Sequence, residues 1–259
     1  MRPKLSTTKR NGVFVLGLVW LAAGGILVSY AQSTQTDIAP SAKPQPAPQK
    51  PLDWPSLHRY QVDNASQRPP GVHEQRVVFM GDSITDGWGR GADKGTFFPG
   101  KPYLNRGISG QTTPQMLVRF QQDVVHLQPS VVVILAGTND IAENTGTSTP
   151  QMIEDNLTSM VEIANANKIK VVLSSITPAY AYPWKPSVQP VDEIREINQW
   201  MHDYCAKEGC IYLDYYSAME DEKGAMLPGY SADGVHPLAK GYEVMAALAE
   251  RAISQALGK

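Results

Sequence analysis

Three residues of this sequence have the types that nucleophilic acyl transfer requires, and they lie in two short polar turns. Ser83 stands in Gly-Asp-Ser-Ile (81–84), directly after an apolar run. A serine hydroxyl acts as a nucleophile when a base takes its proton and donors stabilise the oxyanion that forms. Asp233 and His236 lie in Asp-Gly-Val-His-Pro (233–237), where the aspartate can orient the imidazole as that base. These residues favour a covalent mechanism at Ser83.

A phosphate-binding hydroxyl and a helix cap are the two alternative roles for Ser83. The phosphate-loop and dinucleotide-loop glycine patterns are absent from this turn, and no lysine or arginine lies within it. A cap is compatible with any function. The other four histidines are weaker candidates for the base, because they precede the predicted sheet or lie in helical patterns (His58, His73, His126 and His202).

Two further residues could stabilise an oxyanion. Asn139, in Ala-Gly-Thr-Asn-Asp (136–140), follows an apolar run and could donate its amide into the site, or simply shape a turn. Gly107, in Asn-Arg-Gly-Ile-Ser-Gly (105–110), could present its N–H to a substrate, or serve only as a permissive turn residue.

These residues need strand ends to bring them together, and the sequence supplies five apolar runs that predict strands. Two of the runs are continuously apolar and rich in valine, which is typical of parallel strands covered on both faces. Amphipathic helical patterns separate the runs. The predicted strands are 77–80, 103–105, 131–136, 171–176 and 211–213.

The alternation of strands and helices predicts right-handed βαβ units and an open, doubly wound α/β sheet. In a flavodoxin-like strand order of 2-1-3-4-5, the loops that hold Ser83, Gly107 and Asn139 are neighbours at the carboxyl edge. Thr-Pro-Gln-Met occurs twice, at 113–116 and 149–152, and each copy predicts a helix start with threonine as N-cap.

In four blocks the sequence resembles the SGNH hydrolases, also called GDSL-type esterases. The blocks are residues 81–84 (isoleucine in place of the eponymous leucine), Gly107, Gly-Thr-Asn-Asp at 137–140 and residues 233–237; the resemblance covers residues 54–256. It implies a three-layer αβα sandwich with a five-stranded parallel sheet. It also implies Ser83 as nucleophile, His236 as base and Asp233 as its orienting acid. The implied oxyanion donors are the N–H groups of Ser83 and Gly107 and the Asn139 side chain.

The resemblance leaves the substrate open, since members of the family cleave acetylated sugars, lysophospholipids, aryl and alkyl esters and thioesters. Trp88, Tyr182 and Trp184 could form a platform for a sugar ring, or pack a proline-stiffened loop. We expect a short acyl group, acetyl above all, on a carbohydrate or similar polar alcohol. The alternatives are a lysophospholipase or thioesterase with lipid-like substrates, and a non-catalytic carbohydrate-binding protein on the same fold. No metal or cofactor is expected.

The N-terminus predicts export. Four basic residues precede an apolar stretch at 13–28, and small residues at 29 and 31 predict signal-peptide cleavage after Ala31; the alternative is an uncleaved anchor at 13–28. Residues 32–51 contain five prolines and predict an extended linker, leaving 52–259 as the catalytic domain. Without residues 1–31 the chain keeps 19 basic against 25 acidic residues and no basic cluster, which argues against a nucleic-acid partner and against an anionic-membrane partner beyond the possible N-terminal anchor.

The chain contains two cysteines, Cys205 and Cys210, close together in sequence. They lack the clustered His or Cys neighbours of a zinc site. The spacing is compatible equally with a disulfide in an oxidising compartment and with two free thiols.

Overall fold

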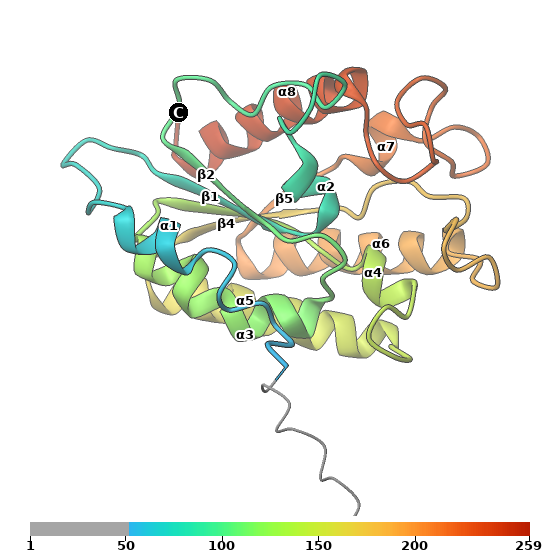
Figure 1. The fold of residues 1–259 in the computed structure, drawn as a ribbon, viewed down its shortest axis with the longest axis horizontal. Helices are drawn as coiled ribbons and strands as arrows, with labels where there is room; N and C mark the ends of the chain where they lie inside the picture. Colours follow the sequence, from blue (N-terminus) through green and yellow to red (C-terminus); the bar gives the residue numbers. More distant parts are fainter. Residues whose placement is uncertain (1–51) are drawn as a thin grey trace, which may run out of the picture. The chain divides into compact units, whose positions relative to one another are not determined.

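Five parallel strands form the centre of the structure, a computed structural model that describes residues 52–259 (Figure 1). The strands are β1 (Val77–Gly81), β2 (Tyr103–Gly107), β3 (Val131–Leu135), β4 (Lys170–Ser174) and β5 (Ile211–Leu213). Their order in the sheet is β2-β1-β3-β4-β5, so the predicted flavodoxin-like order is confirmed. The predicted signal segment (1–31) and linker (32–51) lie outside the described residues.

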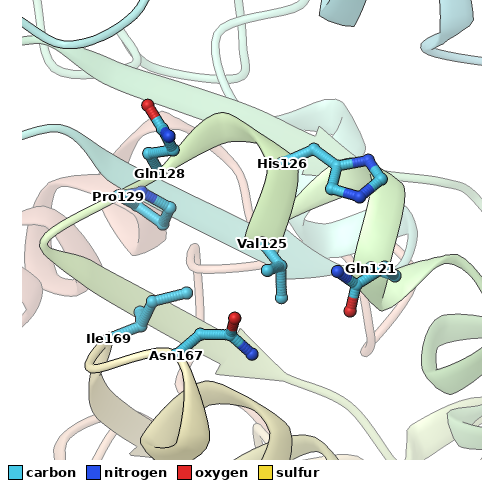
Figure 2. Close-up of a pocket in the computed structure, with 7 residues that line it drawn as sticks. All are labelled: Gln121, Val125, His126, Gln128, Pro129, Asn167 and Ile169. Atoms are coloured by element: carbon cyan, nitrogen blue, oxygen red, sulfur yellow. The ribbon is translucent and has the colours of Figure 1, made fainter.

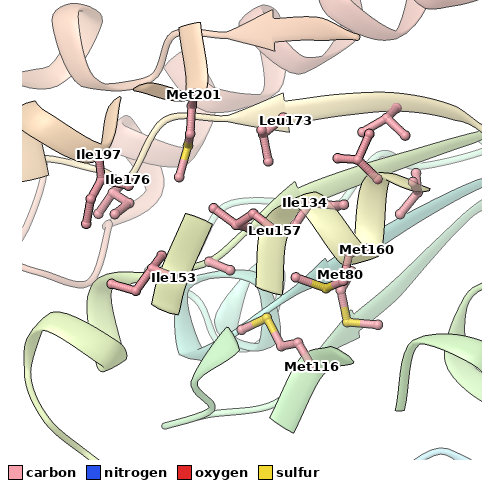
Figure 3. Close-up of a cluster of buried hydrophobic side chains, with 14 of the residues drawn as sticks. Met80, Met116, Ile134, Ile153, Leu157, Met160, Leu173, Ile176, Ile197 and Met201 are labelled. Atoms are coloured by element: carbon pink, nitrogen blue, oxygen red, sulfur yellow. The ribbon is translucent and has the colours of Figure 1, made fainter. Parts of the chain in front are cut away.

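One face of the sheet is covered by α3 (Thr113–Asp123), α5 (Pro150–Ala166) and α6 (Val191–Glu208) (Figure 1). Alternate strand residues such as Met80, Ile134 and Leu173 point to this face and are fully buried. Figure 3 shows them packed against side chains from all three helices, including Met116, Leu157 and Met201. Burying this apolar surface is the main stabilisation of the layer.

The opposite face is covered by α8 (Ala239–Ala256), with the short helices α2 (Ser83–Gly87) and α7 (Tyr216–Met219) beside it (Figure 1). The remaining alternate residues of the strands, such as Phe79, Val133 and Val172, point to this side. Helices on both faces of a five-stranded parallel sheet make the predicted three-layer αβα sandwich, which is therefore confirmed.

Three shorter helical elements complete the described chain: α1 (Gln61–Ser66), the 3₁₀ turn Val125–Leu127 and α4 (Thr138–Ile141). α1 is attached to α3 by Asn64 Nδ2, which donates to Asp123 Oδ1 at 2.6 Å. Within residues 52–259 no helix has the length and apolar character needed to cross a membrane.

The helix starts and ends follow from capping chemistry. Thr149 caps α5 as predicted, and its hydroxyl accepts from the Met152 N–H. The predicted cap Thr113 is wrong by one residue, because Thr112 forms a reciprocal capping box with Gln115 at the start of α3. Thr113 is instead the first helical residue, and its N–H and hydroxyl donate to Asp140.

A disulfide joins Cys205 and Cys210, which resolves the alternative that the sequence left open. Gly209 ends α6 in the left-handed conformation, with φ of 79°, and turns the chain toward β5 between the two cysteines. The bond therefore lies at the amino end of β5, away from the loop that carries Ser83.

Candidate active site

Ser83 is the first residue of α2, directly after β1 and the sharp turn at Asp82. The Asp82 carboxylate accepts from the Ile84 N–H at 2.9 Å and so caps the helix. From α8, the Tyr242 hydroxyl donates to the Ile84 carbonyl at 2.7 Å. The turn is tight because a Cβ on Gly81 would lie 2.1 Å from Thr85 Oγ1. The backbone around Ser83 is thus held from both sides.

Ser83, His236 and Asp233 form a continuous hydrogen-bonded chain across 153 residues of sequence. Ser83 Oγ lies 2.8 Å from His236 Nε2, and His236 Nδ1 lies 2.7 Å from Asp233 Oδ2. With Nδ1–H donating to the carboxylate, Nε2 has a free lone pair toward the serine hydroxyl. The geometry can therefore transfer the serine proton to the imidazole.

The Asp233 carboxylate is held in its ionised form. Partial burial by itself raises its pKa, but the backbone and side-chain hydrogen bonds from His236 and the N–H of Val235 outweigh burial and hold the pKa well below its usual range. The second carboxylate oxygen also accepts from the Ser231 hydroxyl at 3.0 Å. At neutral pH a negative charge thus faces the imidazole Nδ1.

Gly107 does not fit the oxyanion role predicted for it. Its N–H donates to Asn105 Oδ1 at 2.9 Å, and its carbonyl accepts from the Tyr60 hydroxyl. A Cβ at this position would lie 2.1 Å from the Asp86 nitrogen. Gly107 is therefore a packing glycine that lets the end of β2 approach α2, and its N–H is already used.

Gly110, three residues later, is a better candidate that the sequence interpretation missed. It has φ of +78°, and a Cβ built on it meets no atom within 4 Å. Its neighbours flank the site, since Ser109 Oγ donates to Asp86 at 2.8 Å and the Gln111 carbonyl accepts from Asn139. Among the described residues no group accepts a hydrogen bond from its N–H. The two nearby glycines of Gly-Ile-Ser-Gly were the signal available in the sequence.

Asn139 lies in the first turn of α4, and its side chain contacts the residue next to the nucleophile. It is 2% exposed, and its Nδ2 donates to Asp82 Oδ2 at 3.2 Å and to the Gln111 carbonyl at 3.0 Å. Its Oδ1 accepts from Asn144 Nδ2 at 2.7 Å. The amide nitrogen therefore faces the residue that precedes Ser83, and the amide oxygen faces away from it.

A buried arginine connects the nucleophile turn to the loop after β2. Arg119 is fully buried and donates to the Gly81 carbonyl at 3.0 Å, to Gln111 Oε1 at 2.5 Å and to Asp123 at 3.1 Å. The Gln111 backbone carbonyl in turn accepts from Asn139. Arg119 lies on α3 one helical turn before Asp123, and the helical pattern alone gave no sign of this role.

Two buried carboxylates, Asp82 and Asp140, lie next to Ser83 and Asn139 in the chain. Burial raises the pKa of Asp82 to about 6, although the Ile84 N–H and the charge of His236 partly offset it. Burial likewise raises the pKa of Asp140 to about 6, against the lowering effect of the Thr113 hydrogen bonds.

Of the three aromatic residues predicted as a substrate platform, Trp88 does not fit that role. It is 3% exposed and packs among Phe79, Phe98 and Tyr242 in the core between the sheet and α8. Tyr182 is also fully buried, and its hydroxyl pairs with Thr138 Oγ1 at 2.9 Å. Both residues are structural, because neither ring has a free face.

Trp184 is the aromatic residue that borders the site. It is 43% exposed, its ring stacks on Tyr182 at 5.3 Å between centroids, and it lies 6.0 Å from the His236 ring. Its indole N–H donates to Asn144 Oδ1 at 3.1 Å. The structure thus places Trp184 and Asn144 beside the triad, and sequence reasoning did not single out Asn144.

One cavity borders the site. A cavity of about 360 Å³ adjoins Asp233 and Gly234 and is lined by the 180–186 loop and Met226. A larger cavity of about 660 Å³ lies elsewhere (Figure 2), lined by Gln121, Val125, His126, Gln128, Pro129, Asn167 and Ile169. Its residues precede β3 and β4, so it opens at the amino edge of the sheet, opposite Ser83.

In the part of the chain from residue 52 onward, no three His, Cys, Asp or Glu side chains are placed to hold a metal ion.

Comparison with known proteins places this geometry in a family. The profile of the GDSL-like lipase/acylhydrolase family matches residues 79–244, which include Ser83, Asn139, Asp233 and His236. The chain belongs to that family. The resemblance drawn from the four sequence blocks is therefore confirmed, and the family implies hydrolase activity.

Solved structures of other members have the same fold. A GDSL-like lipase from Bacteroides thetaiotaomicron is 43% identical, with a TM-score of 0.75 over 78% of this chain and 98% of that one. A Bacteroides fragilis protein is 45% identical, with a TM-score of 0.76 over 80% of this chain and 99% of that one.

Two curated relatives match over part of their length. The platelet-activating factor acetylhydrolase IB subunit alpha1 of Bos taurus is 27% identical over 57% of this chain and 61% of its own. The acetylxylan esterase of Geobacillus stearothermophilus is 32% identical over 26% of this chain and 40% of its own. The chain thus spans less than two thirds of the length of either relative.

Proposed function

We propose that this acylhydrolase is a serine esterase that cleaves short-chain esters, above all acetyl esters, through an acyl-enzyme at Ser83. The observation that carries the proposal is the hydrogen-bonded chain from Ser83 Oγ through His236 to Asp233. It supplies the nucleophile, the base and the orienting acid in hydrogen-bond contact.

The reaction takes place in two acyl transfers. Ser83 Oγ bonds to the ester carbonyl carbon while His236 Nε2 takes the serine proton, and the imidazolium then gives that proton to the leaving alkoxide. Water then attacks the carbonyl carbon of the acyl-enzyme while His236 takes its proton. His236 returns that proton to Ser83 Oγ as the acyl bond breaks, which releases the carboxylic acid and free Ser83. The ionised Asp233 stabilises the imidazolium in both transfers.

Three donors are assigned to the oxyanion. The Ser83 N–H has no partner within α2, because it belongs to the first turn. The Gly110 N–H replaces that of Gly107, which is bonded to Asn105. The third donor is the Asn139 amide, whose long contact to Asp82, 3.2 Å, is the one that a developing oxyanion would share.

The relatives support the acetyl preference, and the surroundings of the triad bear on the alcohol. The names of both curated relatives refer to an acetyl substrate: one is an acetylxylan esterase and the other a platelet-activating factor acetylhydrolase subunit. The exposed Trp184 ring offers an aromatic surface beside His236 for a sugar. A lipid-like alcohol is the second candidate, because the cavity beside Asp233 is lined by Pro183, Pro186 and Met226.

We also propose that the chain is exported, to the periplasm or the outside of the cell. The Cys205–Cys210 disulfide supports this location, because such bonds persist in oxidising compartments.

Two substrate series test the proposal. With p-nitrophenyl esters of increasing acyl length, we expect kcat/KM to be highest for acetate and to fall steeply by octanoate. Acetylated xylo-oligosaccharide and an acetylated lysophospholipid then separate the two alcohol classes. A preference for long acyl chains would contradict the proposal, as would equal hydrolysis by the Ser83→Ala variant.

A further inference from the structure

Three side chains form a hydrogen-bonded row from the rim of the site to the oxyanion donor. The Trp184 indole N–H donates to Asn144 Oδ1 at 3.1 Å. Asn144 Nδ2 donates to Asn139 Oδ1 at 2.7 Å. Asn139 Nδ2 then donates to Asp82 Oδ2 and to the Gln111 carbonyl. Every bond in the row points in the same direction, from Trp184 toward the turn that carries Ser83.

The direction follows from the chemistry of the first member. An indole nitrogen can only donate, so the side-chain atom of Asn144 that faces it must be the oxygen. The Asn144 amide group then has its nitrogen on the other side, facing Asn139. The atom of Asn139 that meets this nitrogen must be its oxygen, which leaves the Asn139 nitrogen facing Asp82. A reversed Asn139 amide would put two N–H groups, or two oxygens, against each other at each contact.

The burial of Asn139 makes its orientation consequential. A 180° turn of its amide would place Oδ1 against the Asp82 carboxylate and the Gln111 carbonyl, and three acceptors would meet without a donor. The same turn would present an oxygen, not a donor, to an oxyanion formed beside Ser83. The donor function of Asn139 thus depends on its amide oxygen, and not its nitrogen, lying against Asn144 Nδ2.

The two loops that carry the row are joined a second time. Lys185 Nζ forms an ion pair with Glu143 Oε2 at 2.8 Å. Lys185 is the chain neighbour of Trp184, and Glu143 is the chain neighbour of Asn144. Trp184 is also fixed by its stacking on the buried Tyr182. Asn144 is therefore held between a stiff aromatic residue and Asn139.

We propose that Asn144 and Trp184 are positioning residues that set the orientation of the Asn139 amide, so that its N–H groups face the oxyanion. This positioning role rests on the proposed esterase function. Neither residue touches a reacting atom of the ester hydrolysis. Asn144 acts through Asn139, and the Trp184 N–H acts through Asn144.

Kinetics of three variants on p-nitrophenyl acetate test the row. Asn144→Ala removes the donor to Asn139, and Trp184→Phe removes the indole N–H while it keeps a ring on Tyr182. Asn144→Asp keeps the size of the side chain and an acceptor for Trp184, but it cannot donate to Asn139 and attracts the Asn139 nitrogen away from the site. We expect kcat to fall on the order of 10-fold in each variant, most in Asn144→Asp, with KM changed less than about twofold.

Non-additivity distinguishes positioning from a general structural role. In the Asn139→Ala background, Asn144→Ala should cause no further loss of kcat, because the amide that it orients is gone. Lys185→Gln is the matched control, since it breaks the other contact between the same two loops and should leave kcat and KM at wild-type values. Melting temperatures are measured for all variants.

The outcomes separate failure of the row from failure of the esterase function. A wild-type kcat in Asn144→Asp and Trp184→Phe, or an equal fold loss with and without Asn139, would overturn the positioning roles while Ser83→Ala stays inactive. Equal losses in Lys185→Gln would do the same, because they would point to loop stability. If Asn144→Ala does not fold, the Asp and Phe variants still decide between these results. Turnover by Ser83→Ala would instead contradict the esterase function itself.

Discussion

At the scale of single residues, the roles of several side chains follow from hydrogen-bond partners that only the structure shows. Ser83, Asp233 and His236 were named from sequence, because their types and turn positions limit the alternatives. The sequence does not separate Gly107 from Gly110, since both are glycines that follow the strand predicted at 103–105. The structure tells them apart by the bond from the Gly107 N–H to Asn105 and by the crowded space around Gly107 against the open space around Gly110. Trp88 is likewise an aromatic residue of the kind that stacks on sugar rings, but its own ring is buried.

Asn139 gives the sharpest residue-scale prediction. Asn139→Ala should lower kcat by about 10²–10³-fold with little change in KM, the scale for one oxyanion donor. Asn139→Asp should be at least as harmful, because a carboxylate cannot donate and would lie against Asp82. Both are measured per folded enzyme, with melting curves as the check. If Asn139 served only the turn, the Asp variant would keep near wild-type turnover.

Asp140 predicts a dependence of stability on pH. Its pKa is about 6 in the fold against an ordinary 3.8, so the folded protein holds this proton more tightly than the unfolded chain. The stabilisation is therefore complete below about pH 4 and is lost as the pH rises through about 6. From pH 7 to pH 5, wild type should gain roughly 1 kcal/mol of unfolding free energy over Asp140→Asn. Urea denaturation at both pH values measures the difference; a constant or opposite difference would contradict the assignment.

At the scale of elements, the strands and their order were predictable because continuous apolar runs and βαβ alternation leave few topologies. Helix starts were less certain. Thr112 and Thr113 both have capping chemistry, and the buried Asp140 draws Thr113 into the helix. The disulfide was not predictable, because cysteine spacing does not determine geometry.

The contact between β2 and α2 predicts that Gly107 tolerates no side chain. Gly107→Ala would place Cβ 2.1 Å from the Asp86 nitrogen and should cost about 1–3 kcal/mol or more of unfolding free energy. Gly110→Ala is the matched variant: its Cβ meets open space, and only the left-handed backbone is penalised, by about 1–2 kcal/mol. Urea unfolding of both variants compares them, and a Gly107→Ala variant as stable as wild type would refute the packing role.

The disulfide predicts a change in stability without a change in chemistry. Reducing the Cys205–Cys210 bond should lower the unfolding free energy by about 2 kcal/mol, the loop-closure value for a few residues. Because the bond lies at the amino end of β5, kcat of the reduced, folded enzyme should match that of the oxidised one. Denaturation and kinetics with and without dithiothreitol test both statements. A loss of kcat on reduction at a temperature where the protein stays folded would contradict the separation.

At the scale of the whole described chain, the αβα layers bring four distant segments to one edge of the sheet. The turn at 81–84 follows β1, residues 108–111 follow β2, residues 137–140 follow β3, and residues 233–237 lead into α8. The parallel sheet explains why blocks spread over about 150 residues can act together, since the first three follow the adjacent strands β1, β2 and β3. The central claim is that Ser83 is the nucleophile of this arrangement.

Labelling with a fluorophosphonate tests that claim most directly. The reagent phosphonylates a serine that is activated by its base, and mass spectrometry of the digested protein locates the adduct. We predict a single adduct on the peptide that contains Ser83, with ester hydrolysis lost in proportion to labelling and no adduct in Ser83→Ala or in His236→Ala. Full ester hydrolysis by protein without an adduct, or an adduct on another residue that tracks the loss of activity, would contradict the account.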